Sequence, residues 1–407
     1  MKSSVSPARS VHLARLRSGS AAAVAVASLV LLSACSSSSS STSKSSTAST
    51  GTTVSTAGTA SPGATAKAAL AEQAKPLTSI ADAGKSFDAK ALKGKTVYYV
   101  PLVLKADYFQ TVNTLLKSIL APIGVNLQSC DANANPSGIA SCLDQAVAGH
   151  AGAILTDYIP YELAPTSFST VQKAGIPVYI GGESAPAGVT ATPTLRFASP
   201  DDYQFATMRG IMNAAIADSN GKGHILFLST HDDPAVKRAG EYAETYVGKA
   251  CPDCKLITKV VTISQIQTLP SLVSSEVIKD PSITYVIPQY DSYLAPAISG
   301  IQSAGKTNSI KLASANASLA NLPAVKTNPQ VMVAVGHDTA YSAWSMADAA
   351  LRLLAGQQPP DSYPVPVRAF TKGNVTGLDL TTAGEASGKW FGDAAAYQAS
   401  FSKLWGV

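Results

Sequence analysis

The sequence predicts an α/β fold with two lobes, and three observations lead to this prediction. From Lys93 onward, short runs rich in β-branched and aromatic residues alternate with longer amphipathic runs, a pattern typical of parallel sheets covered by helices on both faces. The alternation occurs as two successive series. The stretch from 93 to 407 is also longer than one hydrophobic core usually supports. We therefore expect two lobes, each a parallel sheet flanked by helices.

The first series occupies residues 95 to 182. Its β-rich runs predict strands, and its amphipathic runs with apolar residues near helical spacing predict helices. The expected strands are 95–103, 125–130, 151–158 and 176–182. The expected helices between them are 108–124, 137–149 and 166–175.

The second series begins after the stretch "TLRFASPDDY" and has no obvious sequence repeat in common with the first. Its expected strands are 224–230, 255–263, 284–290, 310–316 and 331–338. Its expected helices are 201–219, 234–249, 268–279, 292–304 and 339–355. Any similarity between the two lobes is therefore expected to be architectural.

A tail at 375–407 continues beyond the second series. Aromatic residues recur in it near helical spacing, namely Trp390, Phe391, Tyr397, Phe401 and Trp405. This spacing predicts a helical extension that packs on a lobe. A role in docking a partner or in covering a ligand is left open.

The amino terminus predicts export. Four basic residues and no acidic residue occur in the first 34 positions, and an apolar run extends from Ala21 to Leu32. A run of about 12 residues is shorter than the roughly 20 that a transmembrane helix needs. We therefore expect residues 1–34 to be a signal peptide.

The sequence Leu32-Ser33-Ala34-Cys35 at the end of this segment resembles the lipobox of bacterial lipoproteins. The resemblance implies cleavage before Cys35 and lipidation of its thiol, which would hold the chain at a membrane surface without spanning it. An ordinary signal peptide cleaved after a small residue is the alternative. Residues 36–72 contain few large apolar side chains, so we expect 35–92 to be a flexible tether.

Charge excludes one class of function. The formal net charge is +5, of which four positive charges lie in the expected signal peptide, leaving 5 − 4 = +1. A basic surface for nucleic acid is therefore not expected, and no nucleic-acid partner is predicted.

Catalytic motifs are also absent. The sequence has no GxSxG, HExxH, P-loop or GxGxxG pattern. The groupings of histidine with carboxylates are His231-Asp232-Asp233 and His337-Asp338, which are more simply explained as polar loop residues or ligand hydrogen bonds. We predict a binding protein with no catalytic residue, no cofactor and no metal.

Four cysteines remain after Cys35, and an even number in an exported chain indicates disulfides. Three pairings are possible. We favour Cys130 with Cys142 and Cys251 with Cys254, because these pairs close the shortest loops. The "CPDC" stretch has no second CxxC and no nearby histidine to favour a zinc site or a redox pair.

Ligands of open parallel sheets bind at the carboxyl ends of the strands. The residues at these ends mix aromatic faces with hydrogen-bonding groups, which suits a small, partly polar ligand. They are Tyr108 and Phe109, Asp157 and Tyr158, Gly182 and Glu183, His231–Asp233, Tyr290 and Asp291, Asn316, and His337 and Asp338.

Several stretches are similar to conserved segments of a known family. They are "ADYFQTV", "KAGIPVYIGG", "DPAVKRAGEY" and "YVIPQYDSYLAPAISGIQSAG". Their order and spacing from about 95 to 370 resemble the type I periplasmic sugar-binding proteins, the ribose-binding group of ABC-importer receptors. The resemblance implies two Rossmann-like lobes joined by a multi-strand hinge, the Venus-flytrap architecture.

The resemblance also implies functional residues. Tyr108 and Phe109 match the aromatic residues that stack on a ligand, and Lys237 stands where an arginine is usual. Tyr290 replaces an asparagine beside Asp291. Asn316 stands where an aspartate is frequent. The complete predicted ligand-binding set is Tyr108, Phe109, Asp157, Tyr158, Glu183, Lys237, Tyr290, Asp291, Asn316 and His337.

One departure concerns the ligand. Where sugar binders of this group usually have Asp-Arg, this chain has Gly182-Glu183, so the planar guanidinium that grips vicinal hydroxyls is missing. Glu183 and Lys237 either replace this clamp from opposite lobes or are ordinary rim charges.

The sequence therefore predicts a lipid-anchored, extracytoplasmic and monomeric receptor that delivers a sugar or polyol to an ABC-transporter permease. An aromatic or other weakly polar ligand, or a sensor that docks on a membrane kinase, are the alternatives. The expected domains after the tether are an N-terminal lobe of 93–199 plus about 337–357, a C-terminal lobe of 200–336 plus about 358–374, and the extension 375–407.

Overall fold

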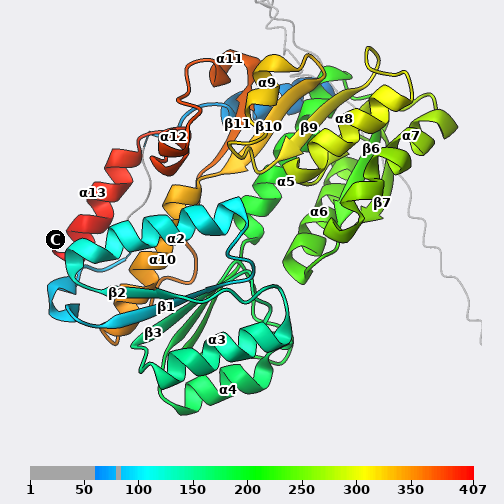
Figure 1. The fold of residues 1–407 in the computed structure, drawn as a ribbon. Coiled ribbons are helices and arrows are strands. Elements are labelled where there is room, and N and C mark those ends of the chain that lie inside the picture. Colours follow the sequence, from blue (N-terminus) through cyan, green and yellow to red (C-terminus); the bar gives the residue numbers. More distant parts are fainter. Residues whose placement is uncertain (1–59, 79–83) are drawn as a thin grey trace, which may run out of the picture. The chain divides into compact units, whose positions relative to one another are not determined.

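A computed structural model describes residues 60–78 and 84–407 (Figure 1). The expected signal peptide, Cys35 and most of the expected tether lie outside the described residues. Within the described ranges, no helix has both the length and the apolar character needed to cross a bilayer.

The first sheet has the strand order β2-β1-β3-β4-β5, and all its neighbouring strands are parallel. Its strands are β1 (Thr96–Pro101), β2 (Asn126–Ser129), β3 (Ala153–Asp157), β4 (Val178–Gly181) and β5 (Leu195–Ala198). One face packs against α3 (Pro136–Ala148) and α4 (Pro165–Lys173). The other face packs against α2 (Asp107–Leu120) and α10 (Thr339–Leu354).

The second sheet has the order β11-β10-β9-β8-β6-β7 and is parallel except for the antiparallel pair β10 and β11. Its strands are β6 (His224–Thr230), β7 (Lys255–Val261), β8 (Tyr285–Pro288), β9 (Lys311–Ala315), β10 (Val331–His337) and β11 (Val367–Thr371). Its helices are α5 (Asp201–Asp218) and α6 (Pro234–Ala250) on one face, with α7 (Leu269–Lys279), α8 (Leu294–Ser303) and α9 (Pro323–Thr327) on the other.

These two helix-covered sheets confirm the predicted α/β fold with two lobes. The chain passes between the sheets after β5, after β10 and again after α10. Short 3-10 turns complete the architecture, namely η1 (Ala89–Leu92), η2 (Ala121–Ile123), η3 (Tyr161–Leu163), η4 (Ile263–Thr268) and η5 (Asp291–Tyr293). The passages between the sheets provide the multi-strand hinge that the sequence predicts.

Part of the expected tether is folded, which corrects its predicted extent. Residues Pro62–Gln73 form helix α1, which packs on α5. Ser61 caps the helix by accepting from Ala64 N. At Gly63 a Cβ would lie 2.6 Å from Asn220 Cα, so the absence of a side chain allows the close approach. The sequence was expected to lack a core here because its residues are small. In the structure the same small residues allow α1 to pack closely on α5.

A second correction concerns the end of the expected tether. Ala89 and Leu92 of η1 are buried in the core of the first sheet. Phe87 N donates to Leu404 O at 2.7 Å, so this segment is held by the carboxyl-terminal tail. The ordered fold therefore begins before residue 93.

The tail is helical, as expected, but contains more than one helix. After α11 (Lys372–Val375), α12 (Thr382–Ala386) is followed by α13 (Ala394–Trp405). Trp390 and Phe391 are buried in the core of the second sheet, whereas α13 packs on α10 in the core of the first. The tail therefore contacts both lobes.

A fully buried aspartate fastens α13 to the first lobe. Asp348 of α10 accepts hydrogen bonds from Arg352 Nε, Tyr363 Oη and Trp405 Nε1, each at 2.7 Å. The guanidinium of Arg352 also donates to Lys85 O at 2.9 Å. Because its carboxylate has three donors, Asp348 is a structural anchor rather than a free functional group.

Candidate functional site

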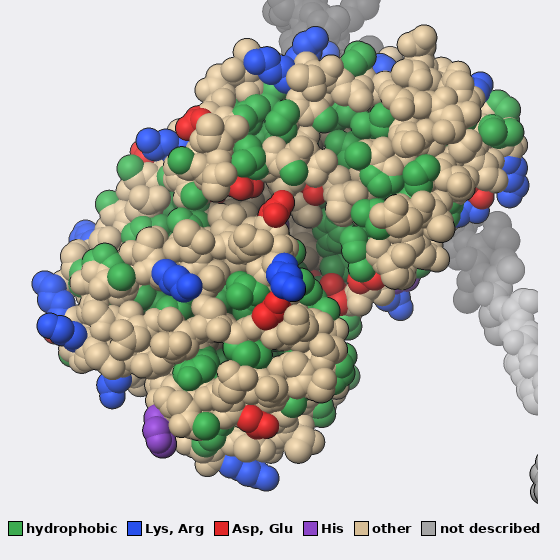
Figure 2. Space-filling model, in the orientation of Figure 1, with side chains coloured by type: hydrophobic (Ala, Val, Ile, Leu, Met, Phe, Trp, Pro, Cys, Tyr) green, Lys and Arg blue, Asp and Glu red, His purple; other side chains and the backbone are tan. Residues whose placement is uncertain are grey.

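Residues that follow strands of both sheets lie against one another. Tyr158 follows β3, and its Oη lies 2.6 Å from Tyr203 Oη near the start of α5. Arg238 of α6 donates to Ser184 Oγ, just beyond β4, at 3.0 Å. We call this region the cleft and define it as Tyr108, Phe109, Asp157, Tyr158, Glu183, Tyr203, Gln204, Asp233, Arg238, Tyr290 and His337. Figure 2 shows a hollow between the two lobes with acidic side chains gathered around it.

Aromatic rings form the centre of the cleft. The centroid of the Tyr158 ring lies 5.8 Å from that of Tyr108 and 6.1 Å from that of Phe109, both in edge-to-face geometry. The centroid of the His337 ring, at the end of β10, lies 4.6 Å from that of Tyr203 and 6.0 Å from that of Tyr108. Rings from both sheets therefore meet here, and their faces and edges can contact an apolar part of a ligand.

The backbone at this position is constrained. Tyr158 has φ 55, in the left-handed region that bulky residues rarely adopt. Gly182 at the end of β4 also has a positive φ, and a Cβ there would lie 2.9 Å from the Tyr158 ring. Backbone strain of this kind is frequently found at functional sites. Gly182 thus lets the Tyr158 ring pack directly against the chain.

Asp157 lies beneath the rings. Its Oδ2 accepts a hydrogen bond from Tyr99 Oη at 2.8 Å, and the residue is almost completely buried. Burial, partly offset by the Tyr99 hydrogen bond, raises the pKa of Asp157 to about 7. Its charge is therefore sensitive to small changes in its surroundings near neutral pH.

Glu183 is the least satisfied carboxyl group of the cleft. It is 3% exposed, and its Oε1 has no hydrogen-bond partner. Burial is the main cause that raises the pKa of Glu183 to about 8, and the nearby Asp233 raises it further. A buried oxygen without a donor costs free energy, so a ligand that supplies a donor gains from the contact.

Two more cleft side chains have unpartnered atoms. Gln204 Oε1 and His337 Nε2 are buried without hydrogen-bond partners. Burial lowers the pKa of His337 to about 4, so its imidazole is neutral near pH 7. Near β6, His231 Nε2 is unpartnered as well. Together with Glu183, these atoms show a local surplus of hydrogen-bonding capacity.

The structure brings Arg238, rather than Lys237, into the cleft. Lys237 is half-exposed and pairs with Glu241 on the same helix at 3.6 Å. Arg238 donates to both Ser184 Oγ and Asp201 Oδ1. Adjacent residues on a helix point about 100° apart, so Lys237 and Arg238 point in different directions, and it is Arg238 that reaches Ser184 and Asp201.

The remaining predicted residues occupy the second sheet's loops. Tyr290 follows β8. Its pKa is raised by burial and also by the neighbouring Tyr158 and Asp233. Because both neighbours belong to the cleft, Tyr290 belongs to it as well. Asp291 Oδ2 is occupied by Ser318 N and Oγ at 2.9 and 2.6 Å. Asn316 has φ 72 after β9. Asp291 therefore holds the loop that carries Asn316.

Sequence reasoning missed Tyr203 and Gln204. Both lie in the first turn of α5, directly after β5, a strand of four residues that the sequence pattern did not predict. Had Leu195–Ala198 been predicted as a strand, the strand-end rule would have directed attention to the residues that follow it. Arg238 was missed for the separate reason of the helix offset described above.

The space among the rings is small. A cavity of about 50 Å³ is bordered by Tyr108, Asp157, Gly182 and Tyr203, whereas sites for small molecules commonly measure about 300–1,000 Å³. A ligand as large as a monosaccharide therefore requires the rings of the two lobes to separate. Across residues 60–78 and 84–407, no three His, Cys, Asp or Glu side chains cluster as a candidate metal site.

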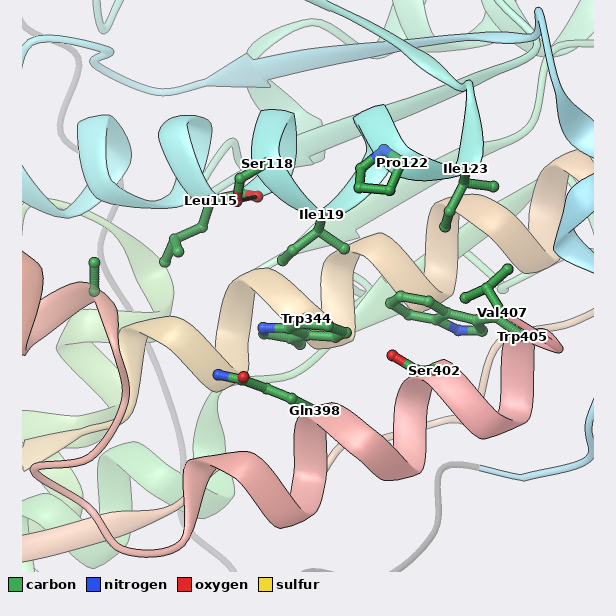
Figure 3. A pocket seen from close by; sticks show the side chains of 11 residues that line it. Leu115, Ser118, Ile119, Pro122, Ile123, Trp344, Gln398, Ser402, Trp405 and Val407 are labelled. Carbon is green, nitrogen blue, oxygen red and sulfur yellow. Dashed lines mark hydrogen bonds between the residues drawn. The ribbon is translucent and has the colours of Figure 1, made fainter.

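A second hollow lies on the outside of the first lobe. It measures about 350 Å³ and lies among α2, α10 and α13. Figure 3 shows Trp344 between Ile119 of α2 and Gln398 of α13, with Trp405 next to it beside Val407. The two indole rings are nearly parallel, 11° apart at 5.3 Å. This hollow is mainly apolar, and its tryptophans pack α13 on α10.

The cysteines come together as the sequence predicts. Cys130 and Cys142 have their sulfur atoms 2.00 Å apart, and those of Cys251 and Cys254 are 1.99 Å apart. Both pairs are local in the sequence.

The cleft combines rings with hydrogen-bonding groups supplied by two α/β lobes. This arrangement defines a two-lobed ligand-binding protein. The sequence matches the family described as periplasmic binding protein domain over residues 97–358, which is more than half of the chain. The chain therefore belongs to that family, and the predicted resemblance is confirmed.

Solved structures of similar fold support the assignment. A 5-methylthioribose transporter solute-binding protein from Thermotoga lettingae TMO, in complex with 5-methylthioribose, has 16% sequence identity and a TM-score of 0.64, with 76% of this chain and 98% of that chain covered. An ABC transporter solute-binding protein from Bacillus halodurans C-125 with bound myo-inositol has 17% identity and a TM-score of 0.60, with 70% of this chain and 96% of that chain covered.

An ABC sugar transporter subunit from Rhodobacter sphaeroides 2.4.1 has 20% identity and a TM-score of 0.59, covering 69% of this chain and 99% of that chain. Among curated protein sequences, none matches this chain. At these identities the structural similarity concerns the fold.

Proposed function

We propose that this protein is the solute receptor of an ABC importer, which captures a small polar ligand, a sugar or polyol, between its lobes and delivers it to a permease. The observation that carries the proposal is the set of buried, unpartnered atoms on Glu183, Gln204 and His337 around a cluster of rings. Hydroxyl groups supply the missing partners, and ring faces receive the apolar side of a sugar. Similar folds with bound 5-methylthioribose and myo-inositol support this ligand class.

The mechanism is closure of two lobes about the crossing segments. The proposed lobes are 93–199 plus about 337–357, and 200–336 plus about 358–374. Tyr108 and Tyr158 come from the first, and Tyr290 and Arg238 from the second. Because each lobe supplies part of the contacts, a ligand stabilises the closed form over the open form. The role is binding and delivery, with no chemical step.

We place the receptor outside the cytoplasm, anchored to the membrane by lipid on Cys35 after cleavage of residues 1–34. The two cysteine pairs are proposed to be disulfides, which suits an oxidising compartment. The residues between the anchor and α1 serve as a tether, and the receptor acts as a monomer beside its permease.

A more weakly polar or aromatic ligand is the second candidate. The density of rings in the cleft favours it, because five aromatic side chains there face only a few hydrogen-bonding groups. The five aromatic side chains are Tyr108, Phe109, Tyr158, Tyr203 and Tyr290.

A thermal-shift screen of the full-length chain in detergent, over sugars, polyols, amino acids and aromatic acids, tests the proposal. A ligand at 100 times its dissociation constant stabilises the folded state by about 2.7 kcal/mol. We expect a shift from one class of sugar or polyol, and loss of that shift in Tyr158→Ala. A shift only with aromatic acids supports the second candidate, and no shift with any compound contradicts the receptor role.

A further inference from the structure

We infer that the ligand of the cleft bears a protonated amine as well as hydroxyl groups, as an amino sugar or an amino polyol does. The inference rests on the proposed function and narrows its ligand class. It starts from Glu183, whose buried Oε1 has no partner.

The charges that face Glu183 are predominantly negative. They are Asp233, which caps α6, Arg238 of α6, Glu162 of η3 and Asp201 of α5. Four carboxyl groups, Glu183 included, thus share one guanidinium. That guanidinium is engaged by Asp201 Oδ1 at 3.1 Å and by Ser184 Oγ at 3.0 Å. Carboxyl groups around Glu183 therefore outnumber the one guanidinium, and a cationic ligand supplies further positive charge.

The unpartnered atoms also favour a donor-rich group. An amide oxygen only accepts hydrogen bonds, and so does a carboxyl group once a cation has brought it into its ionised form; both Glu183 Oε1 and Gln204 Oε1 are free. An ammonium group offers three donors together with its charge. Hydrogen bonds between charged partners are about twice as strong as neutral ones.

The aromatic cluster lies beside these carboxyl groups. Asp233 is close enough to Tyr158 and Tyr290 to raise the pKa of both, so the acidic end of the cleft adjoins the aromatic cluster. Faces of tyrosine rings attract cations. An ammonium beside Glu183 and Asp233 can therefore also contact the rings.

The protonation state of Glu183 gives the inference a distinctive signature. With a pKa of about 8, Glu183 is mostly protonated in the free protein at pH 7. An ammonium that pairs with Glu183 stabilises its carboxylate, so the carboxyl proton passes to the buffer on binding. A neutral sugar causes no such release.

The test compares matched pairs of probes at pH 7 on the full-length chain. The amines are D-glucosamine, D-galactosamine, D-mannosamine and N-methyl-D-glucamine, and the neutral partners are D-glucose, D-galactose, D-mannose and D-sorbitol. Calorimetric titration in two buffers of different ionisation enthalpy measures both affinity and proton release. We expect at least one amine to bind at least tenfold more tightly than its neutral partner, with release of close to one proton.

Two variants locate the effect. Glu183→Gln keeps the shape and removes the charge, and we expect it to abolish the tenfold preference and the proton release. Glu241→Gln makes the same change on the exposed side of α6 and should alter neither. Thermal melts establish that both variants are folded.

The outcomes separate the inference from the proposed function. Equal or tighter binding of the neutral partners overturns the inference and leaves the receptor role intact. Amine preference that persists within twofold in Glu183→Gln also overturns it. If no probe of either set binds, and the broader screen is equally silent, the receptor role itself is contradicted.

Discussion

Two buried carboxyl groups of this protein, Asp348 and Glu183, have opposite surroundings. Asp348 accepts three hydrogen bonds at 2.7 Å, one of them from a guanidinium. Glu183 is nearly as buried but has an oxygen without a partner and faces other carboxyl groups. The first carboxyl group joins α10, α13 and the Tyr363 segment, whereas the second lies at the junction of two lobes.

The difference indicates which buried polar groups support the fold and which are available to a ligand. A satisfied network rigidifies its surroundings, whereas an unsatisfied group is costly until something binds it. Asp348 should therefore be important for stability and unimportant for affinity. Glu183 should be important for affinity and should lower stability when no ligand is bound.

The largest expected effect is that of Asp348→Ala. The change leaves the buried Arg352 without its carboxylate and removes the acceptor of Trp405 Nε1. Loss of one partner of a buried ion pair costs about 3–5 kcal/mol. Urea unfolding should show this decrease in the free energy of unfolding, and ligand affinity should be unchanged where the variant is folded.

Asp361→Ala is the matched control for this variant, because Asp361 also pairs with an arginine, Arg196, but is itself 97% exposed. Its cost should be at most about 1 kcal/mol. A cost for Asp348→Ala as small as that of the control would contradict the structural role.

A smaller effect of opposite sign is expected for Glu183→Gln in the free protein. The pKa of Glu183 is about 8 in the folded state and near its usual 4.5 when unfolded. Between these values the folded state binds more protons, so its stability falls as pH rises. The variant does not lose stability in this way, so its free energy of unfolding should exceed that of the wild type by about 1–3 kcal/mol at pH 8.

Unfolding curves at pH 5, 6.5 and 8 measure the trend. The advantage of the variant should grow with pH across this series. An advantage that shrinks or is constant would show that Glu183 is not a buried, proton-binding group.

A third effect, of about 1 kcal/mol, concerns the contact between the lobes. Tyr158→Phe and Tyr203→Phe each remove the hydrogen bond between the two hydroxyls, which is typically worth about 0.5–1.5 kcal/mol. If the bond links the lobes in the closed form, each variant binds ligand several-fold more weakly. The double variant should be no weaker than either single one, and additive losses would exclude a shared bond.

The smallest effect is expected for Lys237→Ala. Lys237 and Glu241 form an exposed pair on α6, and such pairs contribute about 0.3–0.5 kcal/mol. Ligand affinity, measured by titration, should change less than twofold, whereas Arg238→Ala should weaken it several-fold. A larger loss with Lys237→Ala would restore that residue to the binding site.

Much of the fold was accessible from the sequence, because nine of its strands are continuous runs of β-forming residues between helices of normal length. Helix α1 was not predicted, since its close approach to the turn after α5 depends on the absence of side-chain volume at Gly63 rather than on large apolar residues. The short β5 was missed as well.

The site was predicted less completely, for reasons that are geometric. Tyr108, Tyr158 and His337 lie at or beyond the ends of predicted strands and were found by the strand-end rule. Tyr203 was missed because it follows the unpredicted β5, whereas Arg238 reaches the cleft from the middle of α6, where the direction of a side chain depends on a rotation of about 100° per residue. Sequence spacing alone does not fix that rotation.

The most direct test of the account is a crystal structure of the protein with the amine or sugar that gives the largest thermal shift. We predict ligand donors within about 2.7–3.2 Å of Glu183 Oε1, Gln204 Oε1 and His337 Nε2, with the ligand enclosed by both lobes. A ligand bound instead in the hollow beside Trp344 and Trp405 (Figure 3), with those three atoms still unpartnered, would contradict the account.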